Sequence, residues 1–145
     1  MESSQLLFHL AVGSRFENIE LVQTVLADSL ERLGVARDKS HWIDVAVREA
    51  VANAIKHGHR QDPAKKVEVD LLLEDSDLVV RIQDRGPGFD PAGLEDPLAP
   101  DNLLRPNGRG ILYMKRLMDE VDVAPRPGGG TVVTLRKRVE SPGLT

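Results

Sequence analysis

Apolar residues recur along this chain with two different periods, and the shorter period predicts strands. Every second side chain from Lys66 to Glu74 is apolar, and a similar run follows the polar turn at Asp75–Asp77. Two such runs joined by a short polar turn are typical of a β-hairpin. In all, five segments are predicted to be strands: Gln5–Val12, Lys66–Glu74, Leu78–Gln83, Val121–Val123 and Thr131–Val139.

The longer period, with apolar residues three and four positions apart, predicts helices. Ser14 is a candidate N-cap for the first of them, and Gly34 and Gly58 are expected to end the first two. The three predicted helices run from about Arg15 to Leu33, from Asp38 or Ser40 to His57, and from Ile111 to Met118.

Residues 85–107 follow neither period and are rich in Pro and Gly. A loop of this length in a small domain usually covers a binding site, so a lid is expected here, and the tail from 141 to 145 is expected to be frayed. Strands that meet in hairpins, with grouped helices, predict an α+β two-layer sandwich. We expect a single domain over residues 1–145, with a mixed, mostly antiparallel sheet and three main helices on one face.

Composition narrows the function classes. The 145 residues are 41% apolar, enough for one core, and contain no cysteine, which excludes disulfides, thiolate metal sites and a cysteine nucleophile. The formal net charge is -4 with scattered Lys and Arg, so direct nucleic-acid binding is not expected. Neither a signal peptide nor a membrane span is apparent, and a cytoplasmic protein without membrane contact is expected.

The second predicted helix carries the first candidate functional residues. Glu49, Asn53 and His57 are spaced four apart and would share one face, beside small alanines that would allow a close approach to the helix. An amide oxygen suits Mg²⁺, and a carboxylate one turn away can accept a proton beside a metal-bound phosphate. A solvated helix face has the same spacing, so this pattern alone does not decide between the two.

The segment DRGPGFDP directly follows a predicted strand. Asp84 would lie at the strand end, where its carboxylate can accept a hydrogen bond from an exocyclic amine such as that of adenine. Gly86 and Gly88 would allow the backbone to turn sharply and approach a ligand. A glycine-rich turn with a capping aspartate is the simpler alternative.

The segment NGRGILYMKRL opens the third predicted helix. Gly108 and Gly110 precede it, and backbone N–H groups at a helix start form a natural phosphate site. Arg109 adds a cation between the two glycines. The alternative is a flexible hinge before a helix.

In combination these segments resemble the gyrase/histidine-kinase-like ATPases, whose ATP-binding domain has the Bergerat fold. Within that superfamily the chain most resembles the anti-sigma factor serine/threonine kinases of the RsbW/SpoIIAB type, from the first strand to Lys137. The resemblance rests on four segments in matching order and spacing: EAVANAIKHG, DRGPGFDP, GRGILYMKRLMDEVDV and GGTVVTLRK.

The resemblance implies roles for individual residues. Glu49 would be the catalytic base and Asn53 the Mg²⁺ ligand. Asp84 would bind the adenine amine, supported by Thr131, which is otherwise an ordinary strand residue. The resemblance places the remaining residues near the nucleotide: Lys56, His57, Gly86, Gly88, Gly108, Arg109 and Gly110. His57 has an alternative role as a cation at a helix C-terminus.

The resemblance further implies a serine/threonine protein kinase that uses ATP and Mg²⁺, phosphorylates a STAS-domain anti-sigma antagonist and sequesters a sigma factor. A homodimer that covers the apolar first strand is expected. The alternative is a nucleotide-binding module that sequesters a partner with little or no kinase activity, and Glu49 argues against it. A histidine kinase is less favoured, because the loop reaches Gly108 without a long insertion. Arg15 is the only cation of the first helix before Arg32, so the partner-binding surface is not matched residue by residue.

Overall fold

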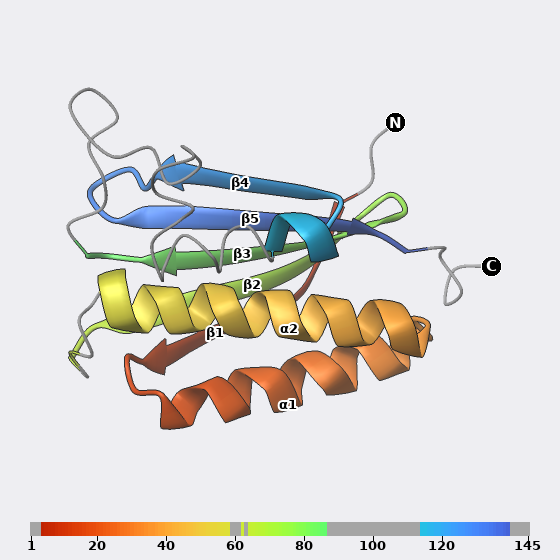
Figure 1. Ribbon diagram of the computed structural model, residues 1–145, viewed down its shortest axis with the longest axis horizontal. Helices are drawn as coiled ribbons and strands as arrows, with labels where there is room; N and C mark the ends of the chain where they lie inside the picture. The colour runs from red at the N-terminus through yellow and green to blue at the C-terminus, as the bar shows by residue number, and fades with distance from the viewer. Residues whose placement is uncertain (1–3, 59–61, 63, 87–113, 140–145) are drawn as a thin grey trace.

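The structure is a computed structural model that describes residues 4–58, 62, 64–86 and 114–139. Two long helices lie side by side in one layer, and five strands form the other (Figure 1). A further helical turn spans residues 114–117. In chain order the elements are β1 (Ser4–Gly13), α1 (Glu17–Arg32), α2 (Arg37–Asn53), the π-helical turn η1 (Ala54–Gly58), β2 (Lys66–Glu74), β3 (Asp77–Asp84), β4 (Glu120–Pro125) and β5 (Thr131–Arg138).

The sheet has the strand order β1-β2-β3-β5-β4, and each of the four pairings between described strands is antiparallel. The predicted α+β sandwich is therefore confirmed, with a described sheet that is antiparallel rather than mixed. Glu74 pairs with Asp77, which leaves a two-residue turn at the β2–β3 hairpin. Asp75 in this turn has a φ of 54°, a left-handed conformation that aspartate tolerates better than most residues.

The start of α1 differs from the prediction. The helix begins at Glu17, and Phe16 rather than Ser14 occupies the capping position, without a side-chain cap. Ser14 is instead fully buried beside β2, and its N–H donates a 3.0 Å hydrogen bond to the carbonyl of Lys65. A contact with a distant part of the chain thus holds Ser14 in the link between β1 and α1.

The ends of α2 also differ in detail from the prediction. The helix begins at Arg37 after Ala36, so neither Asp38 nor Ser40 is its cap. Asp38 lies in the first turn, where a negative charge is favourable beside the exposed N–H groups. None of the helices in the described part of the chain is long and apolar enough to span a membrane.

The core lies between the helix layer and one face of the sheet. The alanines Ala46, Ala50 and Ala54 are buried in this core. Their small size lets α2 lie close to β3 and β5, which it contacts. The strictly alternating β2 and the amphipathic α1 supply much of the remaining core: Val67, Val69, Leu71, Leu73, Val22, Leu26 and Leu30.

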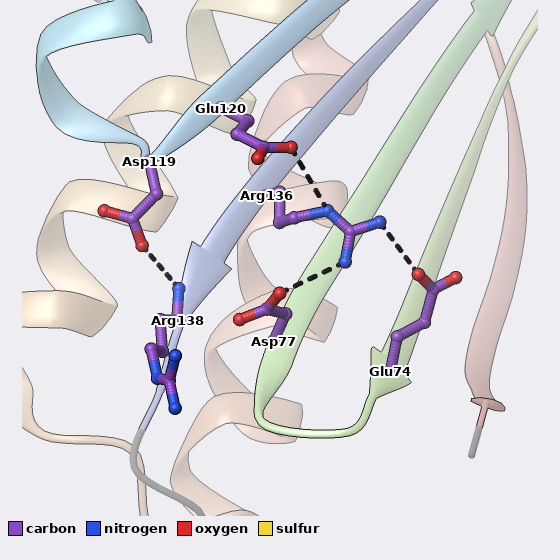
Figure 2. Close-up of polar contacts among 6 residues, drawn as sticks. All are labelled: Glu74, Asp77, Asp119, Glu120, Arg136 and Arg138. Carbon is purple, nitrogen blue, oxygen red and sulfur yellow. Dashed lines mark hydrogen bonds and ion pairs between the residues drawn. The ribbon is translucent and has the colours of Figure 1, made fainter. Parts of the chain in front are cut away.

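Polar contacts attach the segment 114–119 to β5. The ammonium of Lys137 donates a 2.7 Å hydrogen bond to the carbonyl of Leu117. The backbone N–H of Arg138 donates a 2.6 Å hydrogen bond to Asp119, as Figure 2 shows. Met114 and Met118 of the same segment are buried in the core, so this segment is held from both sides.

Candidate functional site

The end of β3 holds a buried carboxylate. Asp84 is the last residue of the strand and is 7% exposed. It lies on the core side of the sheet, because Ile82, two residues earlier, is part of the core. The N–H of Gly86 donates a 2.9 Å hydrogen bond to Asp84 Oδ1. This bond offsets part of the free-energy cost of burying the carboxylate and fixes its orientation. The prediction that Asp84 lies at the end of a strand is confirmed.

The start of β5 lies directly beside Asp84. Thr131 is its first residue, is half-buried and pairs with Asp84 in the β3–β5 register. Gly130 precedes it, and a Cβ placed there would lie 1.9 Å from the carbonyl oxygen of Asp84. Sequence reasoning did not assign Gly130 to the site, because three successive glycines indicate only a turn.

The other half of the candidate site is the C-terminal end of α2. Glu49 and Asn53 are one helical turn apart and half-buried. Asp44 marks the side of α2 that faces α1, since it accepts a 3.2 Å hydrogen bond from Gln23. Five residues separate Asp44 from Glu49, which is roughly 140° around the helix, so the edge that carries Glu49 and Asn53 faces away from α1.

The α-helix that carries Glu49 and Asn53 ends before His57. After Asn53 the α-helix gives way to the π-helical turn η1. A π-turn contains more residues than an α-turn, so the α-helical spacing of four applies only as far as Asn53. Lys56 lies in this turn and is exposed, whereas the side chain of His57 lies outside the described residues.

The fold brings the two halves to the same end of the sandwich. The turn η1 contacts β3, and Figure 1 shows the end of α2 beside the end of β3 and the start of β5. At this end the buried carboxylate of Asp84 can accept a hydrogen bond from a ligand. Glu49 and Asn53 carry oxygen atoms that suit a cation. Within the described residues, no group of three or more His, Cys, Asp or Glu could hold a metal ion. An amide oxygen suits Mg²⁺ when water and phosphate oxygens complete its coordination, so Asn53 fits a nucleotide-bound Mg²⁺.

Part of the predicted site lies outside the described residues. The expected lid from 85 to 107 is described only at its first two residues, Arg85 and Gly86. The residues that remain sequence predictions are Gly88, Gly108, Arg109 and Gly110.

A separate polar cluster lies on the opposite face of the sheet (Figure 2). Arg136 of β5 contacts the carboxylates of Glu74 at 2.8 Å, Asp77 at 3.2 Å and Glu120 at 3.6 Å. The hydrogen bond that Arg136 donates to Glu74, together with the one that it donates to Asp77, raises the pKa of Arg136 despite partial burial. A hollow of about 470 Å³ adjoins the cluster and is lined by Glu120, Val121, Asp122, Thr134 and Arg136. Because this hollow and Asp84 lie on opposite faces, we do not assign it to the candidate site.

Comparisons with known proteins bear on the fold and the family. Residues 12–137 match the family of the histidine kinase-like ATPase domain. The chain is 31% identical to the anti-sigma F factor of Geobacillus kaustophilus over 135 residues, which cover 90% of this chain and 91% of that relative. The solved RsbU and RsbW domains of Rv1364c from Mycobacterium tuberculosis align with a TM-score of 0.68 and 22% identity, over 91% of this chain and 32% of that one.

A second solved structure has the same fold. The SiaB–SiaC complex from Pseudomonas aeruginosa contains a chain that aligns with a TM-score of 0.63 and 15% identity, over 93% of this chain and 91% of that one. The present chain therefore spans almost all of that solved chain but only about a third of the one from Mycobacterium tuberculosis.

Proposed function

This chain belongs to the histidine kinase-like ATPase domain family, and on that premise we propose that it is an ATP-dependent serine/threonine protein kinase that acts as an anti-sigma regulatory factor. Its substrate would be a STAS-domain anti-sigma antagonist, and it would sequester a sigma factor in the cytoplasm. The observation that carries the proposal is that the end of β3, which carries Asp84, and the C-terminal part of α2, which carries Glu49 and Asn53, lie at one end of the sandwich. The anti-sigma F factor that matches nine-tenths of the chain supports the regulatory role.

The nucleotide would bind between the end of β3 and the end of α2. Asp84 would accept a hydrogen bond from the exocyclic amine of adenine, with Thr131 beside it and the backbone of Gly86 turning below. Asn53 would hold Mg²⁺, and a bound Mg²⁺ would neutralise part of the negative charge of the phosphates. The residues proposed to line the phosphates are Lys56, His57, Gly108, Arg109 and Gly110, whereas Gly88 would belong with Gly86 to the turn after Asp84.

Glu49 would act on the acceptor hydroxyl. It lies one turn before Asn53 on the same helix edge, and so beside the phosphates rather than beside the base. As the acceptor oxygen bonds to the γ-phosphorus, the bond to the β–γ bridging oxygen breaks and ADP leaves. The hydroxyl proton passes to the Glu49 carboxylate. Positioning and charge neutralisation supply most of the catalysis in such transfers.

The protein would be a homodimer whose interface includes β1. Both β1 and β4 are edge strands of the described sheet. The β4 edge carries Glu120, Asp122 and Pro125, which discourage pairing with another strand. The β1 edge is apolar instead, and its Leu6 is 57% exposed, which favours β1 as the strand that a partner copy covers.

The test is capture of partners from an extract of the native cells, with and without ATP and Mg²⁺, followed by mapping of phosphorylated residues on each captured protein. The proposal expects a STAS-domain protein that gains phosphate on Ser or Thr only when ATP is present. Captured partners that never gain phosphate would replace the kinase with the sequestering module. Phosphate on a histidine would instead indicate a histidine kinase.

A further inference from the structure

Gly130 lies against the backbone of Asp84 at the candidate site. A Cβ at Gly130 would lie 1.9 Å from the carbonyl oxygen of Asp84 and 2.8 Å from the Cα of Arg85. The φ of Gly130 is +104°, a conformation that residues with side chains rarely adopt. Gly130 is therefore the position at which the start of β5 is pressed against the end of β3.

The neighbouring glycines do not share this contact, although they share the conformation. Gly129 has a φ of +113°, and a Cβ there would meet nothing within 4 Å. A Cβ at Gly128 would meet only the guanidinium of Arg126, at 3.9 Å. Turn geometry alone therefore accounts for Gly128 and Gly129, whereas Gly130 also has to leave room for Asp84.

Arg126 holds the turn in this position. Its N–H donates a 2.9 Å hydrogen bond to the carbonyl of Gly130, and the N–H of Gly129 donates a 2.9 Å hydrogen bond back to the carbonyl of Arg126. Its guanidinium donates to the carbonyls of Pro127, at 3.2 Å, and Gly129, at 3.4 Å. The turn is therefore braced from both ends, and a side chain at Gly130 would displace the end of β3 as well as the turn.

The distance by which the end of β3 would move determines whether the Asp84 carboxylate keeps its orientation. Relief of a 1.9 Å contact requires a movement of roughly 1.5 Å before ordinary van der Waals separation is reached. The hydrogen bond from Gly86 to Asp84 is 2.9 Å long, and a shift of Asp84 relative to Gly86 by that distance would break it. The carboxylate of Asp84 would then lose the orientation in which it can meet a hydrogen-bond donor.

We infer that Gly130 is a positioning residue for adenine recognition: the absence of its side chain places the Asp84 carboxylate where it accepts a hydrogen bond from the exocyclic amine. This inference rests on the proposed function, in which Asp84 binds adenine. It assigns to Gly130 a role in base selection that the conformation of the turn does not require.

The experiment compares two alanine variants that add the same methyl group at similar φ. Gly130→Ala creates the clash with Asp84, and Gly129→Ala is the matched control without it. For each, the affinity for ATP and for purine riboside triphosphate, which lacks the exocyclic amine, is measured by calorimetry with Mg²⁺. The wild type and Gly129→Ala should prefer ATP by roughly 10- to 100-fold, as expected for one hydrogen bond to a charged group. Gly130→Ala should bind the two nucleotides about equally, with little change for purine riboside triphosphate.

The outcomes separate the inference from the proposed function. A wild type that binds both nucleotides equally would refute adenine recognition by Asp84. If the wild type prefers ATP and Gly130→Ala prefers it to the same extent, the role of Gly130 alone is overturned. The same holds if Gly130→Ala loses affinity for both nucleotides by the same factor. If Gly130→Ala does not fold, Arg126→Ala decides, since it loosens the same turn without a clash. It should reduce the preference for ATP several-fold, and an unchanged preference would overturn the inference.

Discussion

Arg136 of β5 donates a 2.8 Å hydrogen bond to Glu74 of β2, although β3 lies between these two strands in the sheet. The side chain reaches across the face of β3 directly over Val79, which pairs with Arg136 and is fully buried. Asp77 at the start of β3 accepts a second hydrogen bond, of 3.2 Å. A single guanidinium thus joins β2, β3 and β5 on the face of the sheet opposite the helices α1 and α2.

Replacement of this arginine should destabilise the fold. Arg136→Leu removes the bonds to Glu74 and Asp77 and leaves carboxylates close together without their cation. The side chain is 29% exposed, so screening by water limits the loss to about 1–2 kcal/mol of unfolding free energy. Urea unfolding followed by the fluorescence of Trp42 measures it. Arg81→Leu, at an exposed position on the same face of β3, is the control and should cost less.

The pH dependence of that loss follows from the direction of the pKa shift. The bond to Glu74 raises the pKa of Arg136, so the stabilisation is present below the ordinary arginine pKa and is lost only as the pH rises through the higher folded value. The difference between Arg136→Leu and the wild type should therefore be constant from about pH 7 to about pH 9. A difference that falls across this range would contradict the assignment.

The fold could be predicted from the sequence where a local pattern determines the element. β2 has its predicted bounds, because its alternation is unbroken and a turn follows directly. β4 is longer than the predicted Val121–Val123, since its charged and proline ends become strand only through pairing with β5. Ser14 was assigned as a cap for a similar reason: its contact with Lys65 depends on a segment far away in the sequence.

In the candidate site, too, features set by local spacing were predicted, and features set by contacts between distant segments were not. Asp84 at a strand end, and Glu49 one turn before Asn53, follow from local spacing and were predicted. The spacing does not encode the π-turn after Asn53, so the end of the α-helix was predicted at His57 rather than at Asn53. The role of Gly130 depends on the pairing of Asp84 with Thr131, which joins segments that are distant in sequence, so a run of glycines could not reveal it.

Asp84→Asn should weaken ATP binding. The amide oxygen of asparagine can keep the hydrogen bond from Gly86, which turns its NH₂ group toward the adenine amine and sets donor against donor. The cost should be roughly 1.5–3 kcal/mol of binding free energy, measured by calorimetry. Asp122→Asn, which alters an exposed carboxylate on the opposite face, is the control. An unchanged affinity in Asp84→Asn would refute the assignment of this residue.

A charge on the β1 edge should disrupt the proposed dimer. Leu6 is 57% exposed in the single chain, and Leu6→Lys would place an ammonium where a second copy is expected to bury apolar surface. Loss of that burial is worth about 1–2 kcal/mol, so the dimer dissociation constant should rise roughly 5- to 30-fold. Sedimentation equilibrium measures this, with Asp122→Lys on the β4 edge as the control. A wild type that is monomeric at high micromolar concentration, with and without nucleotide, would contradict the dimer.

Glu49→Gln should abolish phosphotransfer while ATP–Mg²⁺ binding stays nearly intact. The carboxylate makes no favourable contact with the anionic nucleotide, so its removal costs no affinity. Its proposed role is to accept the proton of the incoming hydroxyl. General acid–base catalysis by a positioned group typically accelerates a reaction by about 10²- to 10⁴-fold. Asn53→Ala should differ by losing Mg²⁺-dependent binding as well as turnover, because the metal ligand itself is removed.

Two measurements on each variant distinguish these roles: nucleotide affinity, and phosphate incorporation into the captured antagonist. Glu17→Gln, an exposed carboxylate in the first turn of α1, is the matched control and should leave both unchanged. Full transfer by Glu49→Gln would exclude Glu49 as the base, because no amide accepts a proton at neutral pH. Loss of binding in Glu49→Gln to the same extent as in Asn53→Ala would instead make Glu49 part of the cation site. The edge of α2 that faces away from α1 would then hold the metal with two side chains and supply no base.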